Sequence, residues 1–225
     1  MLLLAIDTAT SAITVALHDG GVVLAESSTL DARGHGEYLA PGIVDVLARA
    51  GRTAAEVSAV VAGTGPGPFT GLRVGLVTAR TFAFACGIPV FGVCSLDALA
   101  HQAWLADAAE LGQSCVVATD ARRKEVYWAR YDITAGGVKR RGEPMVAKAE
   151  AIADEVQGLP VIGRGAVLYP DWPGPRVGPL DVSAAALASL AARRLAAGEG
   201  LAEAEAMYLR RPDASPLPPR KPALP

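Results

Sequence analysis

The 225-residue chain has few cysteines, few aromatic residues and no surplus of positive charge. Its three cysteines, Cys86, Cys94 and Cys115, are widely spaced and odd in number. This pattern argues against a disulfide framework or a thiolate metal site and fits a reducing cytosol. The formal net charge is −2, whereas an autonomous nucleic-acid-binding protein usually carries a basic surplus. Any contact with RNA is therefore expected to be local or shared with another protein.

Long hydrophobic runs are also missing. No apolar segment approaches the roughly 20 residues that a membrane helix requires, so no membrane contact is expected. The apolar residues 2–6 are followed at once by Asp7 and have no basic region before them, which predicts a first strand rather than a signal peptide. With 51% hydrophobic residues, the chain can bury a substantial core. We expect a cytoplasmic protein.

The hydrophobic pattern predicts two units of the same order, β-β-β-α-β-α, and hence a duplicated α/β fold. The first unit is expected to have strands near residues 2–6, 13–17, 22–25, 59–62 and 90–93, and helices over 37–50, 72–86 and 96–105. The second is expected to have strands at 115–119, 126–131, near 138 and at 161–162, and helices over 149–156 and 184–197.

An aspartate ends the first strand of each unit, Asp7 in the first and Asp120 in the second. The repeat predicts one subdomain over residues 1–106, carrying the expected interface helices, and a more divergent one over 107–211. Residues 212–225 are rich in proline, which predicts a disordered or extended tail.

The most informative stretch is Gly65-Pro66-Gly67-Pro68-Phe69-Thr70-Gly71, here called the signature turn. Glycine permits positive φ and close backbone approach, while proline fixes φ. A rigid turn between a strand and a helix is where α/β proteins often bind anions. The turn lacks the Lys followed by Ser or Thr of a P-loop. Two interpretations stay open: an anion site, or a rigid joint that sets the angle of the next helix.

Several segments together resemble the TsaB (YeaZ) family. The segments are the signature turn continued through Leu72, Arg73, Val74 and Gly75, then Gly87-Ile88-Pro89-Val90, Ser95-Leu96-Asp97-Ala98-Leu99 and residues 120–127. Residues 4–10 also resemble the first phosphate-loop strand of actin, Hsp70 and sugar kinases. The resemblance covers residues 2–132 well and the later part more weakly, and it implies a duplicated actin/Hsp70-like (ribonuclease-H-like) fold.

The resemblance implies a non-catalytic subunit of the bacterial complex that forms N6-threonylcarbamoyladenosine on the tRNA adenosine next to the anticodon. In that family the subunit binds and activates the TsaD transferase, and the TsaE ATPase joins them. The tRNA would be contacted indirectly, through the complex, and the isolated chain is expected to be a homodimer. TsaD relatives hold a metal with a His-x-x-x-His pair, whose positions here carry Ser95 and Leu99. No metal site is therefore expected, which also disfavours a metalloprotease.

An independent ATP-binding phosphotransferase or ATPase of the same superfold is the alternative. Its candidate nucleotide- or phosphate-binding residues are Asp7, Thr8, Thr10, Ser11 and Asp120, with the two aspartates facing each other across a cleft. Against it, an aspartate after a strand often only forms a turn with its own backbone. The resemblance implies no cofactor bound by the chain alone and leaves room for ATP and Mg²⁺ in the assembled complex.

Two predicted helices carry the expected partner interface. The helix over 37–50 has one apolar stripe, and the helix over 72–86 is apolar nearly all round, which requires burial on more than one face. Either another layer of the same chain or a partner subunit could provide the second contact. The candidate interface residues are Leu39, Ile43, Leu47, Leu76, Arg80, Phe82 and Ala83.

The other polar residues are expected at the surface. His18 is predicted to be exposed in a hairpin, His35 to be a capping or surface residue, and Asp97 and His101 to be a solvated pair. Two basic runs are expected as solvated charge at opposite ends of a strand pair, with phosphate contact to tRNA as the alternative. These runs are Arg122-Arg123-Lys124 and Lys139-Arg140-Arg141.

Overall fold

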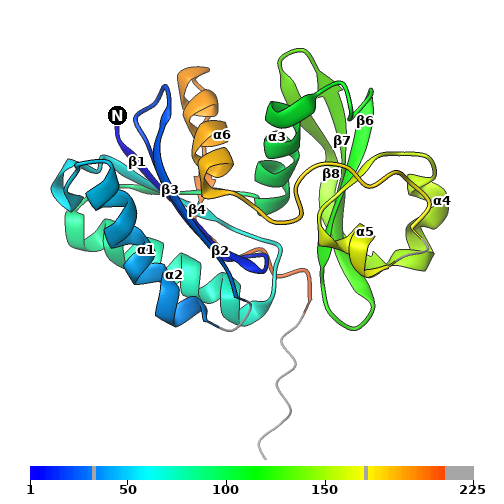
Figure 1. The fold of residues 1–225 in the computed structure, drawn as a ribbon, viewed down its shortest axis with the longest axis horizontal. Helices are drawn as coiled ribbons and strands as arrows, with labels where there is room; N and C mark the ends of the chain where they lie inside the picture. Colours follow the sequence, from blue (N-terminus) through cyan, green and yellow to red (C-terminus); the bar gives the residue numbers. More distant parts are fainter. Residues whose placement is uncertain (32–33, 170–171, 211–225) are drawn as a thin grey trace, which may run out of the picture.

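The computed structural model describes residues 1–31, 34–169 and 172–210, so the predicted tail over 212–225 lies outside the described residues. Within them the strands form two sheets (Figure 1). The first has the order β10-β5-β4-β1-β2-β3, from Ala202–Glu203, Val90–Val93, Ala59–Gly63, Leu3–Asp7, Ala12–His18 and Val23–Leu30. The second has the order β8-β7-β6-β9, from Gly137–Lys148, Glu125–Thr134, Ser114–Asp120 and Val161–Ile162.

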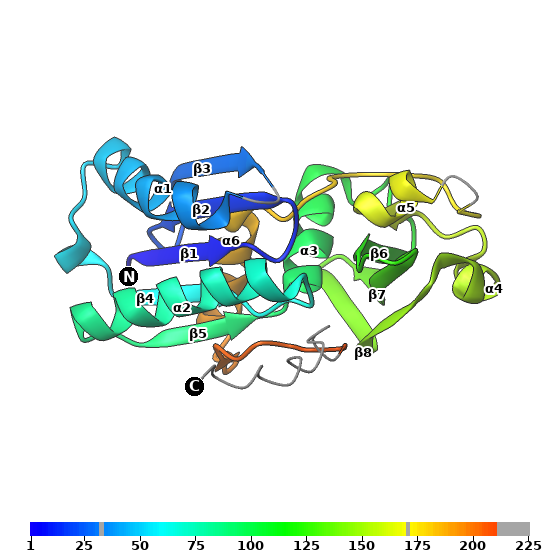
Figure 2. The same ribbon diagram turned by 90° about the horizontal axis from the view of Figure 1, so that it is seen from below.

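Helices and sheets alternate in layers. Helices α1 (His35–Arg49) and α2 (Phe69–Cys86) cover one face of the first sheet, as Figure 2 shows, and α6 (Ala184–Ala196) packs on its other face. Helix α3 (Ser95–Asp107) lies between α6 and the second sheet. The short helices α4 (Ala153–Val156) and α5 (Arg164–Leu168) lie on the far side of the second sheet (Figure 1). No helix in the described ranges is long and apolar enough to cross a membrane.

Strand β1 explains why the first apolar run shows no alternation. It pairs in parallel with β4 and antiparallel with β2, which places it inside the sheet. Leu3 contributes to the core under α3 and α6, whereas Leu4 and Ile6 contribute to the core under α1 and α2. A strand covered on both faces needs apolar residues at successive positions.

The duplicated actin-like fold predicted from the sequence is confirmed, with local differences. Helix α2 begins at Phe69, three residues before the predicted start, because the end of the signature turn already forms its first turn. Residues 149–156 form a 3₁₀ turn followed by α4 rather than one helix, and α5 and β10 were not predicted. Although α6 and β10 belong to the second half of the sequence, they pack on the first sheet. The subdomain division at residue 106 stays a prediction.

Candidate functional site

A cavity of about 230 Å³ lies where the two halves meet, next to the signature turn. We call it the cleft. Among the predicted phosphate-binding residues, Thr10, Ser11 and Asp120 line it, and the signature turn contributes Phe69, Thr70 and Gly71. The cleft is completed by side chains that no motif had indicated: His35, Arg164 and Asp181.

Asp7 and Thr8 do not line the cleft. Asp7 is fully buried, and its carboxylate accepts hydrogen bonds from the Ser95 hydroxyl (2.6 Å) and the Ala9 backbone N–H (2.8 Å). Burial raises the pKa of Asp7 to about 6, although the hydrogen bonds oppose the shift. The Thr8 hydroxyl donates to the carbonyl of Gly71 (2.7 Å). Both side chains therefore hold the backbone around the cleft rather than face into it.

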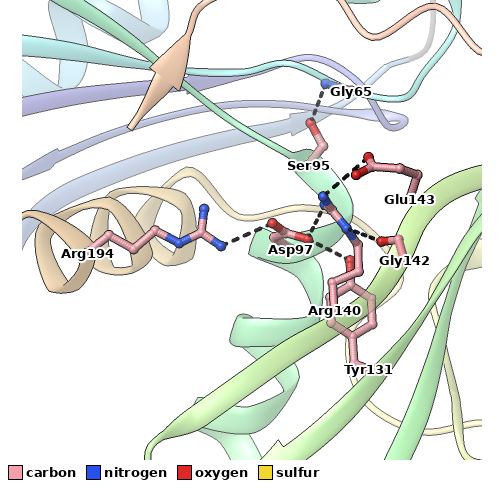
Figure 3. A network of polar contacts seen from close by, with 8 residues as sticks. All are labelled: Gly65, Ser95, Asp97, Tyr131, Arg140, Gly142, Glu143 and Arg194. Atoms are coloured by element: carbon pink, nitrogen blue, oxygen red, sulfur yellow. Dashed lines mark hydrogen bonds and ion pairs between the residues drawn. The ribbon is translucent and has the colours of Figure 1, made fainter. Parts of the chain in front are cut away.

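Ser95 connects Asp7 to the signature turn. Its hydroxyl accepts a hydrogen bond from the Gly65 N–H (3.0 Å), as Figure 3 shows, while its own N–H donates to the Gly65 carbonyl (2.8 Å). Leu99, four residues later on α3, is fully buried in the core between the two sheets. At the two positions where TsaD relatives are expected to hold a metal, this chain thus has a turn-binding hydroxyl and a core side chain.

The signature turn packs against the backbone at the end of β1. Gly65 has φ +86°, a conformation that favours glycine. A Cβ at Gly67 would overlap the Ala9 carbonyl oxygen and lie 2.8 Å from the Ala9 Cα, so the close approach also requires glycine. The aromatic ring of Phe69 lies beneath the Arg73 guanidinium (3.8 Å) and next to Tyr208 (centroids 5.3 Å apart). These contacts favour a rigid joint.

His35 is buried, so its prediction as a capping or surface residue is wrong. It begins α1 beside Gly71, where a Cβ would lie 2.9 Å from the imidazole Nε2. This Nε2 is buried and has no hydrogen-bond partner among the described residues. Burial is the main reason that the pKa of His35 is lowered, which keeps the ring neutral. Because the Nε2 atom is enclosed against Gly71, it is not exposed to a ligand in the cleft.

The charges around the cleft are paired. The Asp120 carboxylate forms an ion pair with the Arg122 guanidinium at 3.0 Å. The Arg164 guanidinium donates to both carboxylate oxygens of Asp181, with Nε 2.9 Å from each and Nη2 2.7 Å from Oδ2. The Ser11 N–H also donates to Asp181 (3.2 Å). Within the described ranges no group of three His, Cys, Asp or Glu side chains could hold a metal ion.

A second polar cluster lies between α3, α6 and the second sheet (Figure 3). Asp97 accepts hydrogen bonds from the Tyr131 hydroxyl (2.9 Å), Arg140 (2.7 Å) and Arg194 (3.1 Å). Both Asp97 and His101 are buried, so the predicted solvated pair is wrong. Burial, together with two neighbouring arginines, lowers the pKa of His101 to about 4. The cluster, here called the Asp97 hub, has a buried aspartate and tyrosine at its centre and two partly exposed arginines, and it joins the two halves.

Two further surface predictions are also wrong. His18 is buried, and its Nδ1 accepts a hydrogen bond from the Gly20 N–H (2.9 Å) in the hairpin. Arg140, expected as solvated loop charge, is part of the Asp97 hub, and its neighbour Arg141 pairs with Asp132 at 2.6 Å. Arg141 meets Asp132 because β8 pairs with β7, and Arg140 meets Asp97 because α3 packs against β8.

Most of the predicted interface residues are occupied within the chain. Leu39, Ile43, Leu76 and Ala83 are buried in the core between the first sheet and its two covering helices, and Leu47 and Phe82 are half-buried against it. The exposed side of α2 instead carries Arg73, Val77, Arg80 and Phe84, which we call the outer face of α2. Val77 is 61% exposed and Phe84 is 89% exposed, an unusual exposure for side chains this apolar. A partner that binds these helices would meet this face.

Known proteins resemble the chain over most of its length. The family model described as TsaD, tRNA N6-adenosine threonylcarbamoyltransferase, matches residues 6–216. The tRNA threonylcarbamoyladenosine biosynthesis protein TsaB of Escherichia coli is 36% identical over 176 residues, covering 76% of this chain and 74% of that protein. An uncharacterised protein of Mycobacterium tuberculosis is 46% identical over 219 residues, which cover 95% of this chain and 94% of that protein. The structure of YeaZ from Pseudomonas aeruginosa superposes with a TM-score of 0.78 at 33% identity, covering 92% of this chain and 99% of that one.

Proposed function

The chain belongs to the TsaB (YeaZ) family of tRNA threonylcarbamoyladenosine biosynthesis proteins, and we propose that it serves there as a non-catalytic subunit. In this role it binds and activates a TsaD-like transferase, and a TsaE-like ATPase joins the pair. The tRNA is held by the complex rather than by this chain alone. A second copy of the chain covers the same surface when the transferase is missing, which gives a homodimer.

The proposed non-catalytic role rests mainly on the contacts that Ser95 and Leu99 make within the fold. The Ser95 hydroxyl is bonded to both Asp7 and the Gly65 N–H, and Leu99 is buried in the core. Neither side chain can ligate a metal as imidazole does. Asp7, which accepts the Ser95 hydroxyl, is itself fully buried. These residues stabilise the fold, and the proposed chemistry takes place on the partner subunit.

The outer face of α2 is the proposed binding surface for the transferase. Exposed apolar side chains on one helix face mark a protein-binding site when they stand together. Val77 and Phe84 are seven residues apart, hence on the same side of α2, and Arg80 lies between them. The signature turn holds the start of this helix, so it sets the angle at which the face is presented.

A matched pair of variants tests this surface. Val77→Glu/Phe84→Glu places two charges on exposed positions of α2 and leaves the core intact, so the variant is expected to fold and to bind the transferase at least about tenfold more weakly. Val167→Glu/Leu168→Glu makes the same change on α5, whose side chains are about half exposed, and should bind normally. Affinity is measured by calorimetry with the TsaD-like enzyme, and folding by circular dichroism. Normal binding by the α2 variant would contradict the proposal.

Binding of a nucleotide in the cleft is the second candidate function. The uncapped first turn of α2 and the guanidinium groups of Arg122 and Arg164 fit a phosphate. They fit Mg²⁺ less well, because Asp120 and Asp181 are already paired with arginine. We place ATP and Mg²⁺ in the assembled complex. Calorimetry with Mg-ATP on the chain alone and on the complex tests this. Micromolar affinity of the chain alone, together with its loss in Arg164→Gln, would favour an independent ATPase.

A further inference from the structure

A second hollow, of about 520 Å³, lies on the far side of the second sheet from α3. We call it the outer pocket. Arg123 and Lys124 reach it from the turn between β6 and β7, and Lys148 from the end of β8. Tyr169 and Trp172, which follow α5, form its aromatic wall. Among the described lining residues, three cations thus stand beside two aromatic rings and one carboxylate, that of Glu150, which lies 3.7 Å from Lys148.

The turn that carries two of these cations has an unusual backbone. Arg122, Arg123 and Lys124 have φ of 62°, 54° and 63°, the left-handed region that favours Gly and Asn. Hydrogen bonds from the Ala121 N–H to the Glu125 carbonyl (3.0 Å) and from the Glu125 N–H to the Arg122 carbonyl (2.9 Å) close the turn. Long cationic side chains therefore occupy positions where glycine would fold with less strain.

The consequence of this backbone is that neighbouring side chains diverge. Arg122 lines the cleft, whereas Arg123 and Lys124 line the outer pocket. Arg210 holds the turn from outside, donating to the Ala121 carbonyl (3.0 Å) and pairing with Glu125. Such strain persists where surrounding contacts fix it, and it is characteristic of functional positions.

Strand pairing and one hydrogen bond complete the pocket. Glu125 pairs with Lys148 across β7 and β8, which brings the Lys148 side chain to the turn. The Tyr169 hydroxyl donates to the Glu125 carbonyl (3.3 Å) and so fixes its ring beside the cations. The other basic run differs in how tightly it is paired: Arg140 and Arg141 lie 2.7 and 2.6 Å from Asp97 and Asp132, whereas Lys148 lies 3.7 Å from the exposed Glu150.

We propose that the outer pocket binds the tRNA, with Lys124 and Lys148 contacting backbone phosphates and Tyr169 stacking against an unpaired base. This inference rests on the proposed function, since it assigns to this subunit one patch of the RNA surface of the complex. Proteins that bind single-stranded nucleic acid combine a cationic groove with aromatic platforms. A local patch is also what a chain of net charge −2 allows, because the remaining surface offers no basic surplus.

Two double variants of equal charge change test the phosphate contacts. Lys124→Asn/Lys148→Gln removes two cations from the pocket, and asparagine keeps the tolerance for positive φ at position 124. Arg49→Gln/Arg52→Gln removes two exposed cations from the other half, where they pair with Asp45 and Glu56. Each is assembled with the TsaD-like partner and titrated with fluorescent unmodified tRNA at several KCl concentrations.

The pocket variant is expected to bind tRNA about tenfold more weakly, and its slope of log affinity against log salt should be shallower by about 1.4 to 1.8. The control should stay within about twofold. Tyr169→Ala should also weaken binding about tenfold. Tyr169→Phe keeps the ring and loses only its hydroxyl bond to the Glu125 carbonyl, so it should weaken binding by no more than about twofold. An equal loss in the two tyrosine variants would instead indicate a structural role and overturn the stacking assignment.

Two other outcomes would overturn the proposal. One is an unchanged affinity and salt slope in the pocket variant. The other is loss of a protein partner by that variant with tRNA binding intact, which would make the pocket a protein-binding site. Failure of the proposed function itself is recognised separately, by calorimetry of the wild-type chain with the transferase. If that binding is missing, the same titrations on the chain alone still test the pocket.

Discussion

Asp7 and Asp120 hold the same position in the two halves of the molecule, yet they have different environments. Each ends the first strand of its half. Asp7 is fully buried and bonded to Ser95, whereas the Asp120 side chain is 21% exposed and faces the cleft with Arg122 beside it. Both halves thus have an acid at this position, but only the second faces the cleft, where Arg122 engages both of its carboxylate oxygens.

The difference follows from what lies beyond each strand. The signature turn and the start of α3 close over the end of β1, and Ser95 joins the two. The end of β6 leads instead into the strained turn at residues 122–124, which opens toward solvent. In the first half, Asp7 therefore stabilises a rigid joint. The following variants test that contrast, beginning with the largest expected effect.

Gly63→Ala should disrupt the Asp7 side most. A Cβ at Gly63 would overlap the Asp7 carboxylate and lie 2.9 Å from the Ser95 hydroxyl oxygen. We expect the free energy of unfolding to fall by about 3 kcal/mol, the upper end of what overpacking a closed site usually costs. Gly36→Ala, where no atom lies within 4 Å, should leave stability unchanged or slightly raised. Urea denaturation measures both, and equal effects would refute the close packing at Asp7.

Asp7→Asn should change the pH dependence of stability. The pKa of Asp7 is raised from 3.8 to about 6 in the folded protein, so the native state keeps a proton that the unfolded chain releases. The contribution of this group to the free energy of unfolding therefore falls as pH rises from about 4 to 6, by on the order of 2 to 3 kcal/mol, and is flat above. Asparagine should abolish this fall. Parallel stability–pH curves for the two proteins would contradict the assignment.

Ser95→Ala removes the link between Asp7 and the signature turn. The Gly65 N–H loses its acceptor and the carboxylate loses a donor, which should cost about 1 to 2 kcal/mol at pH 7. Because the Ser95 hydroxyl lowers the pKa of Asp7, that pKa should rise further and the loss should be smaller at pH 5. Ser114→Ala, the same change at the start of β6, serves as the control. An equal loss at both pH values would argue against coupling to Asp7.

Asp120→Asn should have the smallest effect on stability. Its partner Arg122 has a side chain that is 60% exposed, and such a pair contributes at most about 1 kcal/mol. We expect a change below about 0.5 kcal/mol in thermal or urea unfolding. A loss as large as that of Ser95→Ala would mean that the two halves use their aspartates alike.

Much of the fold could be predicted because the apolar pattern is strong. The continuous runs at β1, β4 and β6 and the glycine at position 87 that ends α2 were all clear in the sequence. The orientation of α2 was not, because a helix that is apolar nearly all round carries little directional signal. Gly71 and Gly75 did carry a directional signal, because both pack against Thr8 at the end of β1 and so mark the side of α2 that faces the sheet. Val77 and Phe84 lie on the exposed side of the helix.

The polar sites were harder to predict because their partners are distant in sequence. Asp97 meets Arg194, 97 residues away, and Ser11 meets Asp181, 170 residues away. A single sequence contains no local signal for such contacts. The aspartates at the strand ends were found, but only the packing of α3 determines that Asp7 is buried and Asp120 is not.

The central claim is that the chain acts by presenting a surface to a transferase rather than by chemistry in its own cleft. Reconstituted threonylcarbamoylation of tRNA by the TsaD-like enzyme, compared with Val77→Glu/Phe84→Glu and with Asp7→Asn/Asp120→Asn, tests it most directly. We predict that the α2 variant loses activation by at least about tenfold and that the aspartate variant activates like the wild type. Full activation by the α2 variant together with loss in the aspartate variant would contradict the claim.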